Sequence, residues 1–291
     1  MYQRQPFEYM TKYTQQKNWI DGRGNFIAFA FFLGGISGGL FMAAAYFDSL
    51  LGMFIAWLLS LCMGISYMIH LGQPLQSWRM FMRPRTSWIS RGFIFIMLFI
   101  GLTFITLILR KWFPDASGAI TTFKVLAGIF AFAQSIYTGF AVSYVSAIKL
   151  WNSAILPILF VVCGFSGGIA ILLGISLNGD QVTVIENVAR ITLIAFAVIL
   201  IVYLWNATYS SATAKNAVAR LMRGGIGIVF WIGVVVLGVI IPIAVSVGTY
   251  FAGEASSAWL LTAVVTEVIG GLSLRYVILK GGMYLPLTSG E

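Results

Sequence analysis

The sequence predicts an all-α integral membrane protein with eight transmembrane helices. Of its 291 residues, 59% are hydrophobic and only 9% are charged, whereas roughly 25% of the residues of a typical soluble domain are charged. Apolar stretches of about 20 residues recur along the chain, and each is long enough to cross a hydrocarbon core of about 30 Å. They cover residues 26–47, 50–71, 92–110, 119–146, 153–177, 184–207, 224–251 and 257–278.

The segments between the spans are short and polar. Residues 1–25 carry four basic side chains and no signal-peptide core, so we expect a retained surface segment. The longest connection, residues 72–91, is too short for a soluble domain. Pro242 lies inside the seventh span and predicts a kink. The other span-associated prolines stand at span edges, where a missing N–H costs least, at Pro74, Pro84, Pro114 and Pro157.

The first and fifth spans contain the same motif. The sequences FFLGGISGGLF and FVVCGFSGGIA share G-x-S-G-G at residues 35–39 and 164–168. Four spans separate the copies, which predicts a parallel repeat of two four-helix bundles, residues 26–146 and 147–291. Small residues at this spacing let helix backbones approach closely. Because such clusters occur in many membrane bundles, chance similarity is the alternative.

Basic residues gather on one side of the predicted topology. The side that holds both termini has fourteen of them: Arg4, Lys12, Lys17, Arg23, Arg79, Arg83, Arg85, Arg91, Lys149, Lys215, Arg220, Arg223, Arg275 and Lys280. The other side has four: Arg110, Lys111, Lys124 and Arg190. This bias predicts cytoplasmic termini, and we expect the membrane to be a bacterial or archaeal plasma membrane. The net charge of +9 therefore follows the topology and does not indicate nucleic-acid binding.

The protein has too few ligands for a redox metal centre. It contains two cysteines, Cys62 and Cys163, and one histidine. An iron–sulfur cluster normally takes four Cys ligands, and a bis-imidazole haem needs two His. We expect neither a haem, an iron–sulfur cluster nor another metal site in this protein, and we expect the cysteines to fill the core. Metal centres would then belong to a partner subunit.

The single histidine, His70, is the leading candidate for proton chemistry. It ends the second span and opens the polar segment HLGQPLQSWRMFMRPRTSWISRG, residues 70–92. Imidazole changes charge near neutral pH, which suits proton-coupled chemistry on a ligand dissolved in the bilayer. The alternative is that His70 anchors a helix end at the headgroups. Candidate ligand contacts nearby are Trp78, Arg79, Ser90 and Arg91, together with Asn25 at the start of the first span.

Polar residues inside the spans are further candidates, because they are costly in a membrane. Gln134, Tyr137 and Thr138 share one face of the fourth span. Glu267 lies near the middle of the eighth span, and such a carboxylate must find a partner, bind a proton or face water. Arg275, two turns on, is a possible counter-charge. Glu186 and Arg190 are spaced as an i,i+4 ion pair.

Four stretches resemble the NrfD/PsrC family of membrane subunits of polysulfide, thiosulfate and nitrite-type reductases. They are FFLGGISGG in the first span, HLGQP…SWISRG after the second, residues 137–168, and GGLSLRYVILKGG at 270–282. The resemblance implies two four-helix bundles and a menaquinone or ubiquinone site with Tyr137 at the quinone. It also implies a ferredoxin-like iron–sulfur subunit with four 4Fe–4S clusters, facing the His70 segment, and a molybdopterin catalytic subunit.

This sequence departs from the family pattern in the His70 segment. Gln73 and the Gln76–Ser77 pair stand where the family often has basic residues, so we expect partner docking through this segment to differ from the family pattern. In polysulfide-reductase relatives the N-terminal face meets a periplasmic partner, whereas the charge count here places that face inside.

The leading hypothesis is a quinone-binding subunit of a respiratory oxidoreductase. His70 would take a quinol proton, Tyr137 would bond a quinone oxygen, Trp78 would pack on the ring, and Arg79 and Arg91 would stabilise developing negative charge. Glu267 and Arg275 would serve coupled proton movement. A secondary transporter or proton channel is the main alternative, which the repeat and Glu267 would suit. A passive membrane anchor is the third.

Overall fold

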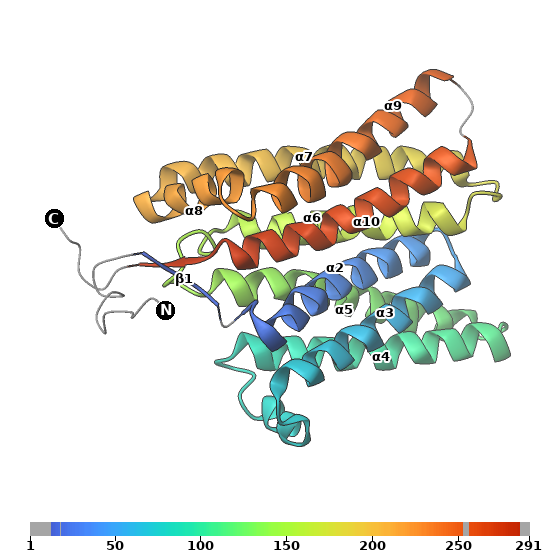
Figure 1. Ribbon diagram of the computed structural model, residues 1–291. Coiled ribbons are helices and arrows are strands. Elements are labelled where there is room, and N and C mark those ends of the chain that lie inside the picture. The colour runs from blue at the N-terminus through green and yellow to red at the C-terminus, as the bar shows by residue number, and fades with distance from the viewer. Residues whose placement is uncertain (1–12, 18, 253–255, 286–291) are drawn as a thin grey trace.

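The computed structural model describes residues 13–17, 19–252 and 256–285, and the statements below concern those residues (Figure 1). Most of the expected N-terminal surface segment, with Arg4 and Lys12, lies outside them. The prediction of an all-α protein with eight spans is confirmed. The helices long and apolar enough to cross a membrane are Gly22–Tyr46, Leu50–Leu71, Trp88–Trp112, Ser117–Ser143, Ile155–Ile175, Val182–Ser210, Val229–Ala252 and Ser257–Lys280.

These spans correspond to single helices with two exceptions. The first combines a short 3₁₀ turn, η1 (Gly22–Gly24), with α2 (Asn25–Tyr46), and the seventh combines η3 (Val229–Ile240) with α9 (Ile241–Ala252). The others are α3 (Leu50–Leu71), α4 (Trp88–Trp112), α5 (Ser117–Ser143), α6 (Ile155–Ile175), α7 (Val182–Ser210) and α10 (Ser257–Lys280). Serine side chains cap two of them, because Ser49 accepts from the Gly52 N–H and Ser87 from the Ser90 N–H.

Four shorter elements lie in segments that the sequence marked only as polar connections. A 3₁₀ helix, η2 (Pro74–Met82), follows α3, and α8 (Ala212–Arg223) follows α7. The strands β1 (Thr14–Gln15) and β2 (Met283–Tyr284) pair antiparallel, with Thr14 opposite Tyr284. In Figure 1, β1 and α8 lie at the same end of the bundle. We call this end, which also carries η2, the strand face, and the end with the α6–α7 and α9–α10 connections the opposite face.

The seventh span changes its winding near Pro242. Residues Val229–Ile240 form a π-helix, and an α-helix follows from Ile241. Long π segments are rare and often mark functional regions of a helix. Pro242 has no N–H to donate to the preceding turn, which is consistent with a change of winding there. The kink expected at Pro242 stays a prediction.

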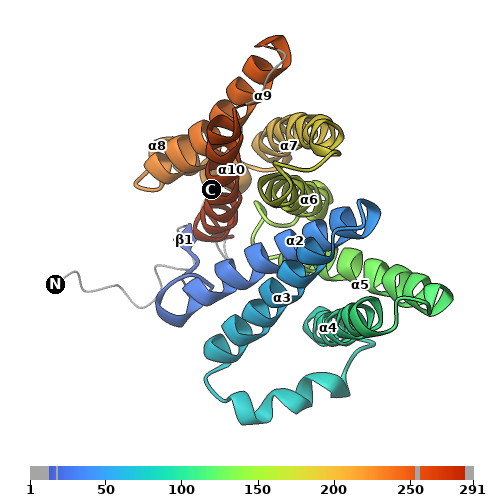
Figure 2. The ribbon, with the colours of Figure 1, turned by 90° about the vertical axis from the view of Figure 1, so that its right-hand side faces the viewer.

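The two G-x-S-G-G motifs pack against each other where α2 crosses α6. A Cβ built on Gly39 would clash with the carbonyl oxygen of Gly164, and one on Gly164 would lie 2.6 Å from the carbonyl carbon of Gly35. Only glycine allows backbones this close. Figure 2 shows α2 between α3, α4 and α5 on one side and α6, α7 and α10 on the other. The division into bundles at residues 26–146 and 147–291 stays a prediction.

Candidate functional site

A cavity of about 930 Å³ lies among α2, α3, η2, α4 and α5. Its lining is mostly apolar, with Trp19 and Phe31 on one side and aliphatic, Met and Phe side chains of α3, η2 and α4 on the others. Four polar side chains reach it: Tyr67, His70, Ser77 and Tyr137. An apolar cavity of this size with a few polar groups is typical of a site for a small organic ligand.

Two tyrosines form the polar centre of this cavity. The hydroxyl of Tyr137 on α5 donates to the hydroxyl of Tyr67 on α3 over 2.7 Å. Tyr137 is almost fully buried, and its ring lies against the backbone of α4, because a Cβ on Gly92 would overlap the ring. Since Tyr137 uses its proton on Tyr67, the Tyr67 proton is free to bond a ligand oxygen.

His70 lines the same cavity, one helical turn after Tyr67. Its Nδ1 lies 3.2 Å from the carbonyl oxygen of Arg23. A carbonyl oxygen only accepts, so this contact places a proton on Nδ1 and leaves Nε2 to accept one from a ligand. Gly72, at φ 70°, ends α3 just beyond, as left-handed backbone favours glycine. The structure therefore brings together His70 and Tyr137, which are 67 residues apart in the sequence.

Tyr67 was not among the residues selected from the sequence. The sequence feature that could have identified Tyr67 is its position three residues before His70, because residues at this spacing lie on one face of a helix. A tyrosine in an apolar span is often structural, so this spacing alone did not single it out.

Gln134 and Thr138 do not line the cavity. Gln134 is fully buried and joins three helices: its Nε2 donates to Ser37 Oγ over 2.7 Å, and its Oε1 accepts from Ser60 Oγ over 2.9 Å. Thr138 donates to the carbonyl oxygen of Ser135 in its own helix. Both side chains therefore satisfy polar groups within the bundle, although they share a face with Tyr137.

Arg91 stabilises the connection between η2 and α4. Its guanidinium donates to the carbonyl oxygens of Pro84 and Arg85 over 2.8 and 2.7 Å and stacks on the Trp88 ring. Ser90 is buried beside it at the start of α4.

The remaining predicted contacts, Trp78, Arg79 and Asn25, are not in the cavity lining either. Trp78 is exposed on η2, and Asn25 is exposed at the start of α2. The structure thus places neither these three residues nor Ser90 and Arg91 in the lining of the cavity. Their neighbours Ser77, Met80 and Ile89 are there instead.

Glu267 and Arg275 are buried in α10, apart from this cavity. Glu267 is 7% exposed and accepts a hydrogen bond from Ser166 of α6. Arg275 is 1% exposed, donates to the carbonyl oxygen of Phe160 over 2.7 Å and lies 4.2 Å from the Phe160 ring centre. Within the described residues, Nε and one terminal nitrogen of Arg275 have no hydrogen-bond partner. Of the three predicted catalytic residues, His70 thus lines the cavity, whereas Glu267 and Arg275 do not.

On the opposite face, Asp48 bonds Arg110 over 2.5 and 2.7 Å and Lys124 over 3.2 Å. The hydrogen bond from Arg110 is the main reason why the pKa of Asp48 lies below its usual value of 3.8, and the bond from Lys124 lowers it further. This cluster ties the α2–α3 turn to α4 and α5.

Comparison with known proteins identifies the family of this chain. The family model described as polysulphide reductase, NrfD, matches residues 23–286. The C subunit of the polysulfide reductase of Wolinella succinogenes is 32% identical over 172 residues, which is 56% of this chain and about half, 52%, of that protein's length. The NrfD homolog of Haemophilus influenzae is 25% identical over 251 residues, covering 75% of this chain and 77% of that protein. With eight membrane-spanning helices and a family match over most of its length, the chain belongs to the NrfD polysulphide reductase family.

Proposed function

We propose that this protein is the membrane anchor and quinone-binding subunit of a respiratory oxidoreductase complex. The observation that carries the proposal is the apolar cavity in which His70, Tyr67 and Tyr137 meet. A menaquinone or ubiquinone ring has two carbonyl oxygens on an apolar body, which fits a mostly apolar cavity with a few polar groups. The family's polysulfide reductase relative supports the same class of complex.

The geometry suggests how these side chains would act on a quinol, which gives up two protons with its two electrons. His70 is held by the Arg23 carbonyl with Nε2 available, so it would take a proton from a quinol hydroxyl. Tyr67 has a free hydroxyl proton and would hold a quinone oxygen, while Tyr137 would orient Tyr67. Both protons and both electrons must leave the cavity, the electrons to a partner that carries metal centres.

We propose that the partners dock at the strand face. η2 contributes Ser77 and Met80 to the cavity lining, and its Trp78 and Phe81 side chains are exposed. An iron–sulfur subunit with four 4Fe–4S clusters placed there would receive electrons near the cavity, and a molybdopterin subunit would carry the terminal reaction. Genes for both beside this one would support the assignment.

Filling the cavity tests the proposal. Gly64 lines it, and a Cβ there would meet nothing within 4 Å, so Gly64→Phe places a ring in the ligand space without a clash at Cβ. We expect at least a tenfold rise in the apparent KM for quinol in the assembled complex. Gly101→Phe is the matched control, because Gly101 also has open space but does not line the cavity. Equal quinol kinetics for both variants would refute the site.

Replacing His70 tests the proposed base. General-base catalysis typically contributes 10²–10⁴-fold, so His70→Ala should lower quinol-dependent turnover by about 10²-fold. Reduction of the terminal substrate with an artificial dye as donor bypasses the quinol, and it should be unaffected. Wild-type quinol kinetics in His70→Ala would show that His70 only anchors the end of α3.

A secondary transporter or proton channel is the second candidate, and the buried Glu267 favours it. The two functions combine if quinol oxidation moves protons through the bundle. In that case Glu267→Gln, which keeps the shape of the side chain, should lower the number of protons moved per quinol in vesicles. A pure transporter would move its substrate without quinol and would be insensitive to Gly64→Phe.

A further inference from the structure

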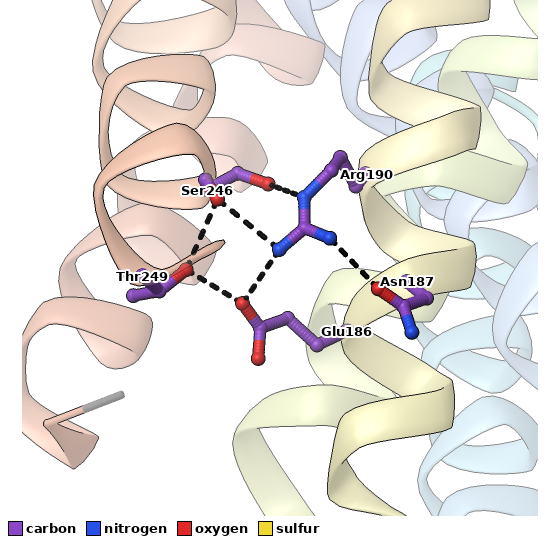
Figure 3. Close-up of polar contacts among 5 residues, drawn as sticks. All are labelled: Glu186, Asn187, Arg190, Ser246 and Thr249. Atoms are coloured by element: carbon purple, nitrogen blue, oxygen red, sulfur yellow. Dashed lines mark hydrogen bonds and ion pairs between the residues drawn. The ribbon is translucent and has the colours of Figure 1, made fainter. Parts of the chain in front are cut away.

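A polar cluster near the opposite face lies between α7 and α9 (Figure 3). Arg190 donates to Glu186 over 3.0 Å, to Asn187 over 2.7 Å and to the Ser246 hydroxyl over 2.8 Å. Thr249 donates to the same Glu186 oxygen over 2.6 Å. The side chains of Glu186 and Arg190 are only 14% and 18% exposed, so this is an ordered, largely buried group. It bonds α7 to α9 rather than pointing into water.

Two cavities lie against this cluster and share Glu186, Arg190 and Leu260 in their linings. An outer cavity of about 330 Å³ is lined by Thr183 and Asn187 and by Glu186 and Arg190. An inner cavity of about 30 Å³ is lined by the same Glu186 and Arg190 and reaches Glu267. A site needs roughly 10–15 Å³ to hold one water molecule, so the inner cavity has room for about two. The polar side chains around it are Glu186, Arg190, Ser246 and Glu267.

The backbone beside the inner cavity is irregular. Pro242 lines this cavity, at the point where the seventh span changes from π-helix to α-helix. In transporters, irregular helices line cavities in the membrane interior, because freed backbone groups need water or polar partners there. Ser246, one turn after Pro242, is the residue of this span that bonds Arg190.

We infer that the Glu186–Arg190 cluster and these two cavities form a proton path from the opposite face to Glu267. A hydronium ion entering the outer cavity would pass its proton along the waters beside Glu186 to the Glu267 carboxylate, leaving water behind. Arg190 would stay in place, because its bonds to Glu186, Asn187 and Ser246 hold it. Cys163 on α6 is a further titratable group close to Glu267, and Arg275 lies two turns further along α10.

This inference deepens the proposed function and rests on it for its physiological role. The quinone cavity lies next to η2, on the strand face, whereas the path opens near the start of α7, on the opposite face. A quinol site served from one face and a carboxylate served from the other would let turnover move protons across the membrane.

Hydrogen–deuterium exchange at Glu267 tests the path without quinol. In the full-length protein in lipid, the infrared C=O band of a protonated carboxyl shifts in D₂O. A band that is present in wild type and absent from Glu267→Gln is the band of Glu267. Ala263→Leu fills the inner cavity, which Ala263 lines. It should slow the exchange at least tenfold, whereas Ala258→Leu, exposed on the same helix, should exchange like wild type. Glu186→Gln, a conservative change, should also slow it.

The path is overturned if wild type, Ala263→Leu and Glu186→Gln exchange at equal rates. It is also overturned if wild type has no C=O band that disappears in Glu267→Gln. The proposed function fails separately. If Gly64→Phe leaves quinol kinetics unchanged while the exchange rates differ as expected, the path stands and the quinone site does not. If quinol kinetics respond and the exchange rates are equal, only the path is wrong.

Thiol labelling tests which face the path opens to. Leu260 is buried but lines both cavities, whereas its neighbour Leu261 is 44% exposed and lines neither. With Cys62 and Cys163 replaced by Ala, a charged methanethiosulfonate reagent added on the opposite face should label Leu260→Cys at least tenfold faster than Leu261→Cys. Slower labelling of the buried position would overturn the path, because a dry cavity leaves its thiol unreactive.

Discussion

At the scale of single residues, the hydrogen bond between Tyr67 and Tyr137 assigns different roles to two chemically identical side chains. Tyr137 donates its proton to Tyr67 and has α4 against its ring. Tyr67 keeps its proton and faces the cavity beside His70. The sequence pointed to Tyr137 and His70, but it could not show that Tyr67 lies between them, because that depends on how α3 and α5 pack.

We therefore predict that Tyr67→Phe weakens quinone binding more than Tyr137→Phe. A lost hydrogen bond to a buried ligand costs about 1–1.5 kcal/mol, so Tyr67→Phe should raise the apparent Kd for quinone about tenfold. Tyr137→Phe removes only the group that orients Tyr67 and should have a smaller effect. The double variant should resemble Tyr67→Phe alone in a quinone titration. Independent, additive effects would instead mean that both hydroxyls contact the ligand.

At the scale of elements, the contact between α2 and α6 depends on glycine. A Cβ at Gly39 would clash with the backbone of Gly164 and Phe165, and backbone atoms cannot turn aside as flexible side-chain atoms do. Gly39→Ala should therefore lower stability by about 1–3 kcal/mol, as overpacking typically does. Thermal unfolding in detergent measures this.

Gly128→Ala is the control, because Gly128 lies in α5 and a Cβ built on it would have nothing within 4 Å. Alanine favours a helix over glycine by about 1 kcal/mol, so this variant should be neutral or slightly more stable. A loss of stability equal to that of Gly39→Ala would mean that the crossing tolerates a methyl group.

The Asp48 cluster gives a pH-dependent prediction. Because the folded state lowers the pKa of Asp48, its contribution to stability is present above the unfolded value, near 3.8, and is lost as pH falls through the folded pKa. The Asp48 side chain is 59% exposed, so this contribution is at most about 1 kcal/mol. Asn tolerates the positive φ of 58° at this position. Asp48→Asn should therefore lower Tm at pH 7 and converge with wild type below pH 3.8. A Tm difference that is the same at neutral pH and in acid below the folded pKa would exclude a role for the charge.

Apolar length was sufficient to predict the eight spans, because hydrophobicity alone selects segments that cross a membrane. It was not sufficient for η2 and α8, whose polar faces make them look like loops, or for β1 and β2, which pair residues near opposite ends of the sequence. The spacing of Glu186 and Arg190 predicted their ion pair. It could not predict Ser246 and Thr249 as partners, since these come from a different helix.

At the scale of the whole molecule, the distribution of basic residues predicts a cytoplasmic strand face. A reporter that is active only in the cytoplasm, fused after Glu291, should be active. Cysteines introduced at Arg83 or Arg223 should be protected from a membrane-impermeant reagent in intact cells. Labelling from the periplasm would show that the orientation is the reverse of this prediction. The path to Glu267 would then open to the cytoplasm.

The glycine contact between the two G-x-S-G-G motifs also limits how this protein can change. Each copy is the surface on which the other packs, so the two segments behave like the interface of a dimer joined into one polypeptide. A larger residue in either copy would push α2 and α6 apart. Ser37 of α2, which bonds Gln134, would then move away from Ser166 of α6, which bonds Glu267. A mutation that enlarges one copy would therefore need a compensating change on the facing helix.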